Sequence, residues 1–298
     1  MEVNRASLAG INTAFNTIFN GALGGVEVTW PKVAMNVPST TRENDYRWLG
    51  KLKGMREWIG DRVVDNVIKD GYKVVNKSFE NTVAVDRDDM ADDQIGIYNP
   101  LVADLGQTAA ELPDELVWNL LNDGFTTPCY DGQNFFDTDH PVIGKDGGEE
   151  SVSNFAGGAG PAWFLLDTTR AIKPLIFQDR QKPQLVARID MDDDNVFWRK
   201  EYVWGVDMRC AAGFGLWQLA YASKQTLNKG NYMAARAAMQ SMKGDHGRQL
   251  RLRPTLLVVP PTLEQAALEV LKAERDAAGA TNVAKDTATL HVEQLLAA

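Results

Sequence analysis

Residues 100–123, PLVADLGQTAAELPDELVWNLLND, decide the fold prediction because they carry the strongest helical pattern in the chain. Asn99 is expected to cap this helix and Gly124 to end it. At 1.5 Å per residue the helix would be a rod of about 36 Å. Pro113 has no backbone N–H to donate, so we expect a kink or a break there. The leucines recur near one face, at Leu101, Leu105, Leu112, Leu116, Leu120 and Leu121.

The segment before this helix predicts an N-terminal arm. Residues 7–20 form an expected helix with Ser7 as its cap and apolar residues at helical spacing, namely Leu8, Ile11, Phe15, Ile18 and Phe19. Residues 26–45 follow, with two prolines and several β-branched residues, and are expected to be extended rather than packed. The apolar stripe of the helix must be buried, and a partner subunit is a natural place for it.

Residues 62–79, RVVDNVIKDGYKVVNKSF, predict a β-hairpin. Asp70-Gly71 between two β-rich runs is a strong hairpin signal. Two strands alone are only marginally stable in water, so this hairpin is expected to rest on another surface.

The second half of the chain reads as mixed helices and strands, which makes the fold class α+β. Residues 124–160 are rich in loops, and 231–243 form an expected helix. Residues 254–261 contain an expected buried strand that Pro260 and Pro261 stop. Thr262 and Gln265 are expected to form a capping box for a helix that Gly279 ends. Residues 287–296 resemble a last strand.

Composition narrows the class of protein. The net charge of −9 argues against a protein that wraps nucleic acid, since that needs clustered basic residues. Cys129 and Cys210 make no disulfide framework and are typical of a reducing compartment. Neither a secretory signal nor an apolar run of about 20 residues is visible, so we expect a soluble intracellular product.

The motif FFDTDHP, residues 135–141, is the main candidate for chemistry. Asp137, Asp139 and His140 offer oxygen and imidazole donors that could bind a metal. A tight site usually takes three or four protein ligands, and the other two histidines lie far away in the sequence. Asp-Thr-Asp is also typical of a turn, and we favour that interpretation.

Other motifs do not indicate catalysis. The acidic runs 86–94 and 190–195 lack the order of an EF-hand and are expected to be a solvated face and a turn. No dinucleotide-binding glycine motif, phosphate-binding loop or nucleophile elbow occurs. We therefore expect no catalytic residue, no cofactor and no metal, and a structural role.

Six stretches, taken in order, resemble the major head subunit of Mu-like transposable phages and prophages over nearly the whole chain. They are YRWLG at 46–50, MREWIGDR at 55–62, KSFENTVAVDRDDMADDQIG at 77–96, FFDTDHPV at 135–142, AWFLLDTTRAIKPLIFQ at 162–178 and LLVVPPTLEQAALEVL at 256–271. The resemblance implies the tailed-phage major capsid fold named after Hong Kong phage ninety-seven. It also implies that His140 is structural.

The resemblance implies four parts of the chain. They are an N-terminal arm at 1–45, an extended-loop hairpin with its flanks at 46–95, a spine helix with part of the peripheral domain at 96–155, and the remaining peripheral and axial elements at 156–298. It further implies intersubunit contacts, which we expect at Leu8, Ile11, Phe15, Phe19, Trp30, Lys69, Asp70, Gly71 and Tyr72.

The implied function is a non-enzymatic one. Copies of the chain would form hexamers and pentamers of an icosahedral shell around double-stranded DNA, in the virion and, during assembly, in the host cytoplasm. The implied partners are a scaffolding protein, a maturation protease, a portal, and minor capsid or decoration proteins, with no membrane. Two alternatives stay open, a cellular nanocompartment shell of the same fold and a metal-dependent enzyme centred on His140.

Overall fold

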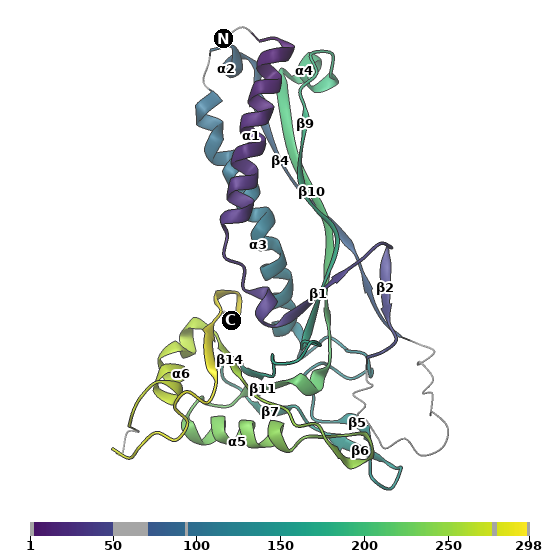
Figure 1. Ribbon diagram of the computed structural model, residues 1–298, viewed down its shortest axis with the longest axis vertical. Helices are drawn as coiled ribbons and strands as arrows, with labels where there is room; N and C mark the ends of the chain where they lie inside the picture. The colour runs from purple at the N-terminus through teal and green to yellow at the C-terminus, as the bar shows by residue number, and fades with distance from the viewer. Residues whose placement is uncertain (1–2, 50–70, 93–94, 276–278, 297–298) are drawn as a thin grey trace.

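The computed structural model describes residues 3–49, 71–92, 95–275 and 279–296, which form a slender arm on a wider base (Figure 1). The arm holds two long helices and a four-stranded sheet. The base holds a five-stranded sheet, two helices and the C-terminus.

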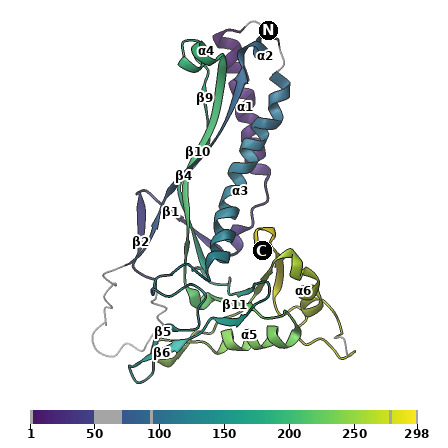
Figure 2. The same cartoon turned by 180° about the vertical axis from the view of Figure 1, so that it is seen from behind.

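The arm is built on two helices that lie side by side, α1 (Arg5–Gly25) and α3 (Asn99–Asp123). Both lie against one face of a sheet with the strand order β1-β9-β10-β4 (Figure 2). The strands are β1 (Ala34–Pro38), β4 (Lys77–Asp86), β9 (Leu175–Arg188) and β10 (Glu201–Phe214). Two short helices, α2 (Arg87–Ala91) and α4 (Asp194–Arg199), lie at the far end of the arm.

The base is a mixed sheet with the order β15-β14-β8-β11-β7. Its strands are β7 (Phe155–Gly158), β8 (Trp163–Leu166), β11 (Ala220–Lys224), β14 (Leu256–Val259) and β15 (Thr289–Val292). Strands β8 and β14 are buried along their whole length, as their continuous apolar sequences predict. The helices of the base are α5 (Lys229–Ser241) and α6 (Glu264–Leu271).

Three short strand pairs and six 3-10 turns complete the described part of the chain. The pairs are β2 (Glu43–Tyr46) with β3 (Tyr72–Val75), β5 (His140–Ile143) with β6 (Glu149–Val152), and β12 (Lys243–Gly244) with β13 (Arg248–Gln249). The turns are η1 (Trp30–Lys32), η2 (Ile95–Tyr98), η3 (Trp217–Leu219), η4 (Asp245–Gly247), η5 (Pro261–Leu263) and η6 (Gln294–Leu296).

The predicted spine helix is confirmed, and it does not break at Pro113. Helix α3 continues through the proline as one element and ends at Gly124, whose N–H donates to the Leu121 carbonyl. The cap prediction is wrong, because Tyr98 precedes the helix and makes no side-chain cap. The predicted leucine face is also partly wrong, since Leu101 is exposed. The buried face instead consists of Val102, Leu105, Gly106, Ala109, Ala110, Val117, Trp118 and Leu121.

Several local predictions near the termini are corrected by hydrogen bonds. Asn4, and not Ser7, caps α1, and the Ser7 side chain returns a bond in a capping box. Helix α6 has no side-chain cap, so the predicted capping box is wrong. Gln265 donates to Glu269 one turn later. The helix ends at Leu271, well before Gly279.

Residues 26–45 are not a free arm. Strand β1 pairs in parallel with β9 and forms an edge of the arm sheet. Strand β3 pairs with β2, from residues 43–46. Asp70 and the first run of the predicted hairpin lie outside the described residues.

Candidate functional site

The motif at 135–141 lies in the core where the arm meets the base. Phe135 and Phe136 are buried. The Phe135 ring stacks on Phe214 with a centroid distance of 4.4 Å. The motif therefore connects the end of β10 with the loop that follows α3.

His140, the first residue of β5, is fully buried and is held on three sides. Its Nδ1 lies 2.8 Å from Asp131 Oδ2, and its Nε2 lies 3.2 Å from Asn154 Oδ1. Its ring stacks on Trp217 with centroids 3.9 Å apart and an interplanar angle of 9°. These contacts confirm that His140 is part of the packed core.

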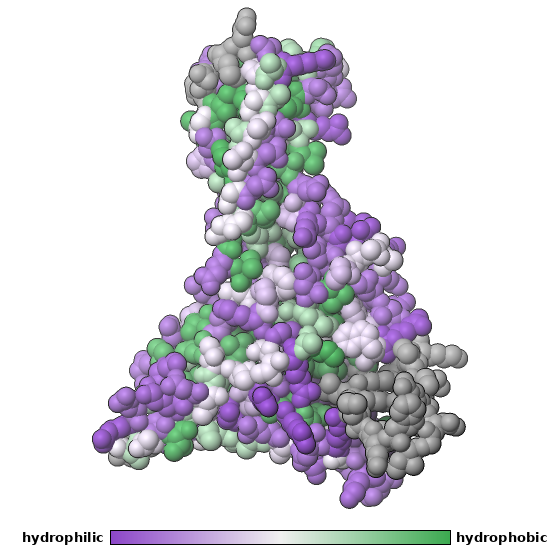
Figure 3. Space-filling model, in the orientation of Figure 1, coloured by the Kyte–Doolittle hydropathy of each residue, from purple (hydrophilic) through white to green (hydrophobic). Residues whose placement is uncertain are grey.

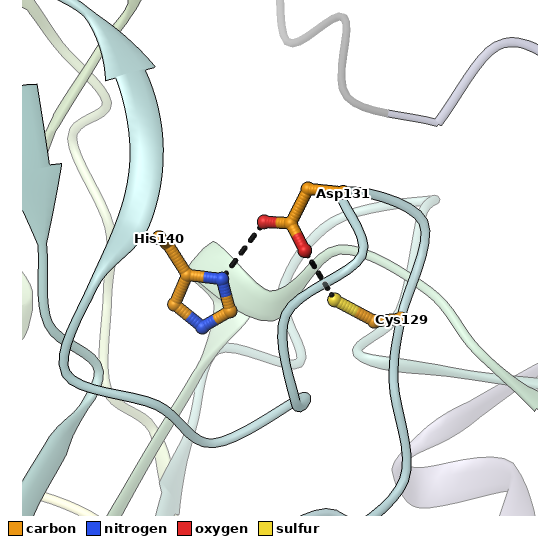
Figure 4. Close-up of side chains that lie close together, drawn as sticks. All are labelled: Cys129, Asp131 and His140. Carbon is orange, nitrogen blue, oxygen red and sulfur yellow. Dashed lines mark hydrogen bonds and ion pairs between the residues drawn. The ribbon is translucent and has the colours of Figure 1, made fainter. Parts of the chain in front are cut away.

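Asp131 connects His140 to Cys129 (Figure 4). The Cys129 thiol donates to Asp131 Oδ1 over 3.0 Å, and the Gln133 N–H donates to the same oxygen over 3.1 Å. Burial alone would raise the pKa of Asp131, but the hydrogen bonds with His140 and Cys129 outweigh it and lower that pKa. Asp131 is therefore a carboxylate that accepts from three donors.

The order of these three groups argues against a nucleophile. In a catalytic triad the imidazole lies between the nucleophile and the carboxylate, so that it can take the proton. Here the carboxylate lies between the thiol and the imidazole. Burial, reinforced by the Asp131 charge, raises the pKa of Cys129 far above its ordinary value, so the thiol keeps its proton.

Cys129, Asp131 and His140 are also the one group among the described residues whose donors could surround a metal, since these atoms lie within 4.8 Å of one another. Metal binding would require the thiolate, which burial disfavours here. The hydrogen bonds already satisfy the thiol and both ring nitrogens. The geometry fits a hydrogen-bonded cluster without a metal.

The predicted alternative of a metal held by Asp137, Asp139 and His140 does not fit. Asp137 accepts from the Thr138 N–H, and its carboxylate shares a hydrogen bond with Asp139 that raises the pKa of Asp139. The His140 nitrogens face other partners. The chain bends at Thr138, and Asp137 bonds the adjacent backbone N–H, which agrees with the favoured interpretation.

The two acidic runs cap short helices. Asp86 accepts from the Asp88 N–H at the start of α2, and Asp193 accepts from the Asn195 N–H at the start of α4. Carboxylates are stabilising at these positions because they satisfy free N–H groups. Local capping therefore accounts for one carboxylate in each run.

The prediction that Leu8, Ile11, Phe15 and Phe19 contact a neighbouring subunit needs correction. All four are buried in the core of the arm of the same chain, where they pack with α3 and β10. Phe15 meets the Trp204 ring edge-on with centroids 4.9 Å apart. The stripe was correctly identified as buried, but its partner is this chain.

Trp30 and Tyr72 also contact their own chain. The Trp30 ring lies 4.7 Å from the ring of Phe177. The Tyr72 hydroxyl accepts from the Phe214 N–H over 3.0 Å. A Cβ on Gly71 would overlap the Asp45 carboxylate, so a larger residue there would require the Asp45 side chain to move. Lys69 and Asp70 lie outside the described residues.

Among the described residues, the most exposed large apolar side chains lie on α4, and the sequence analysis missed them. Phe197 is 71% exposed and Trp198 is 76% exposed, whereas Val196 beside them is buried. Their rings meet edge-on with centroids 4.9 Å apart. A short helix can bury only one of three consecutive apolar residues fully, so the run Val-Phe-Trp was the available signal. We call Phe197 and Trp198 the apolar tip.

Figure 3 shows hydrophobic and hydrophilic residues side by side at the end of the arm. Exposed aromatic pairs of this kind typically mark interaction sites. No helix among the described residues has both the length and the hydrophobicity to cross a membrane.

The fold and these contacts agree with comparisons to known proteins. The sequence model described as "Mu-like prophage major head subunit gpT" matches residues 8–296. This chain belongs to the Mu-like major head subunit family.

Two relatives of the family have closely similar sequences. The chain is 45% identical to the major capsid protein of Escherichia phage Mu over 292 residues, which is 96% of each chain. It is 42% identical to the Mu-like prophage FluMu major head subunit of Haemophilus influenzae over 267 residues, which is 87% of each chain.

Solved structures confirm the predicted α+β major capsid fold. A chain from the procapsid of bacteriophage JBD30 matches with a TM-score of 0.88 and 44% identity, covering 98% of this chain and all of that one. A chain from the JBD30 capsid matches with a TM-score of 0.78 and 32% identity, covering all of both chains. These matches support the predicted head subunit and not the nanocompartment alternative.

Proposed function

We propose that this chain is a major capsid protein whose copies assemble into the icosahedral head shell that encloses double-stranded phage DNA. The proposal rests on the family match over residues 8–296. It also rests on the structural match to the JBD30 procapsid chain, which extends over all of that chain. The chain would act as a structural protein and not as an enzyme. The buried thiol and imidazole, which lack the order of a catalytic triad, support that part.

The proposed assembly consists of hexamers and pentamers formed in the host cytoplasm and carried in the virion. A scaffolding protein, a maturation protease and a portal are proposed partners. Decoration proteins are a further partner class, because a JBD30 capsid decorated with minor capsid protein trimers contains a chain of this fold with a TM-score of 0.77 and 33% identity. The net charge of −9 suits a lining that DNA passes without being bound tightly.

The domains follow from the two sheets. We assign the arm with α1, α3 and the β1-β9-β10-β4 sheet to the peripheral domain, and the five-stranded sheet with α5 and α6 to the axial domain. Strands β9 and β10 belong to the arm, whereas β8 and β11 belong to the base. Residues 156–230 would therefore be shared by both domains.

We propose the apolar tip as a contact with neighbouring subunits. It takes the place of Leu8, Ile11, Phe15 and Phe19, which are buried within their own chain. Because the tip lies at the end of the arm, away from the base of its own chain, its burial requires another molecule. Aromatic residues, and tryptophan above all, contribute disproportionately to such contacts.

The first test is to express the chain alone and, where needed, with a scaffolding protein, and to look for shells by electron microscopy. Shells, rings of five or six, or sheets are the expected products. A monomer that gives no shells even with the scaffold would contradict the proposed function.

The tip is tested in the same system with the variant Phe197→Ser/Trp198→Ser. Both side chains are exposed in the single chain, so we expect an unchanged unfolding midpoint and a loss of closed shells. Val283→Ser is the matched control, since Val283 is 66% exposed in the base, and it should assemble normally. Normal shells from the tip variant would refute the contact but not the capsid function. Deleting residues 1–40 is a poorer test because it would expose the core of the arm.

A further inference from the structure

The surroundings of His140 determine how many protons its ring carries. The ring is fully buried, and each nitrogen has one hydrogen-bond partner, Asp131 at Nδ1 and Asn154 at Nε2. The orientation of the Asn154 amide and the charge of Asp131 therefore decide the protonation of His140.

The Asn154 amide has one orientation that satisfies all its neighbours. Its Nδ2 donates to the Phe135 carbonyl over 2.8 Å and to the Trp217 carbonyl over 3.3 Å. Its Oδ1 accepts from the Asp137 N–H over 2.9 Å. The flipped amide would set an oxygen against two carbonyls and an NH₂ against an N–H. The group that faces His140 Nε2 is thus an acceptor, and Nε2 carries a proton.

The group that faces Nδ1 is also an acceptor. Asp131 already accepts from the Cys129 thiol and from the Gln133 N–H. An ionised carboxylate with these donors has no proton to give to Nδ1. Nδ1 must then donate as well, because a lone pair there would face the Asp131 oxygen at 2.8 Å.

The remaining neighbours favour a cation. The Trp217 ring lies parallel to the imidazole at 3.9 Å, where its π face attracts positive charge. The adjoining loop and η4 contribute four carboxylates, Asp131, Asp137, Asp139 and Asp245, and one histidine, His246, which is exposed. Cys129 and Tyr130 are neutral.

We infer that His140 is a buried imidazolium that donates from both nitrogens and thereby fastens the loop after α3 to the base. Asp131 belongs to that loop, Asn154 lies between β6 and β7, and Trp217 belongs to η3 between β10 and β11. The charged ring joins these segments at the place where the arm meets the base. Loss of either proton would leave a ring lone pair facing an acceptor oxygen and would loosen this connection. The inference does not depend on the proposed function.

The experiment uses the full, unassembled subunit labelled with ¹⁵N at its three histidines. Long-range ¹H–¹⁵N spectra distinguish an imidazolium from either neutral tautomer. Near neutral pH we expect the His140 signals to show protons on both ring nitrogens, because both nitrogens face acceptors. His246→Gln identifies the His246 signal by its loss. A single neutral tautomer for His140 at that pH would overturn the inference.

Two carboxylate variants sharpen the test. Asp131→Asn should convert His140 to a neutral tautomer at the same pH. Asp245→Asn is the matched control, since Asp245 accepts from the Ile143 N–H and not from the ring, and it should leave the imidazolium intact. The opposite pattern would overturn the inference, as would stoichiometric zinc whose removal by a chelator shifts the Nδ1 signal. The wild-type spectrum is decisive even where a variant fails to fold.

Discussion

Replacing Gly106 with alanine tests whether the N-terminal helix is part of the subunit core. Gly106 lies on α3 where α1 crosses it. An added Cβ would lie 2.5 Å from the Phe19 carbonyl oxygen, 3.0 Å from Ala22 Cβ and 3.1 Å from the Leu23 nitrogen. The nearest of these atoms is backbone, which cannot swing away as a side chain can.

The expected sign is opposite to that of an ordinary helical glycine. In an open helix position, alanine stabilises by about 1 kcal/mol relative to glycine. Here α1 would have to move by about 1 Å to restore an ordinary separation of roughly 3.5 Å. Overpacking of this kind costs about 1–3 kcal/mol, and we expect about 2–3 kcal/mol here because the obstructing atom is backbone. The intrinsic gain of about 1 kcal/mol from alanine offsets part of this cost. We therefore expect Gly106→Ala to lower the free energy of unfolding by about 1–2 kcal/mol.

Gly10→Ala is the matched control, because Gly10 lies on α1 with no atom within 4 Å of an added Cβ. It should raise the free energy of unfolding by about 0.5–1 kcal/mol. The assay is urea unfolding of the unassembled subunit, read as the midpoint by circular dichroism. If Gly106→Ala is as stable as the wild type or more so, α1 does not pack on α3 as described.

Three further predictions follow from buried contacts. Phe15→Ala should lower the free energy of unfolding by about 3–5 kcal/mol in the same assay, because Phe15 is 1% exposed and packs on Trp204. A decrease of less than about 1 kcal/mol would contradict that burial. Asp114→Ala should lower the free energy of unfolding by about 1–3 kcal/mol, because the Asp114 carboxylate accepts from the Thr29 and Trp30 N–H groups. An unchanged unfolding midpoint would mean that other contacts fix the segment after α1. Burial would raise the pKa of Asp131, but its hydrogen bonds lower that pKa below the ordinary 3.8. The stability that Asp131 contributes is therefore complete above pH 3.8 and is lost as the pH falls through the lower, folded-state pKa. Asp131→Asn should flatten this acid dependence of the thermal unfolding midpoint, and an equally steep dependence in the variant would mean that other groups cause it.

The sequence alone was sufficient for the elements with strong local signals. The spacing of apolar residues gave the helix at 99–123, and Gly124 marked its end. The continuous apolar run at 256–259 gave a buried strand, as β14 shows. Six ordered motifs identified the family, which the match over residues 8–296 confirms. Each of these signals lies within a short window of the chain.

The sequence misled where the outcome depends on distant residues. Of the kink or break expected at Pro113, the break does not occur. Helix α3 continues through the proline and is packed against α1, η1 and the sheet, which offsets one lost hydrogen bond. The capping box predicted at Thr262 is absent, since η5 occupies that turn. His140 was correctly taken as structural, but its partners Asp131 and Asn154 lie 9 and 14 residues away. No spacing rule connects them.

For α1 the sequence by itself determined which face must be buried, and the tertiary structure decided what buries it. A period of three to four apolar residues requires the face of α1 to leave water, but it carries no information on whether α3 of the same chain or another subunit covers it. Only the fold brings Phe15 to Trp204 and leaves Phe197 and Trp198 exposed at the end of the arm. The physical reason is that the hydrophobic effect is non-directional, whereas packing partners are set by contacts between residues far apart in the chain.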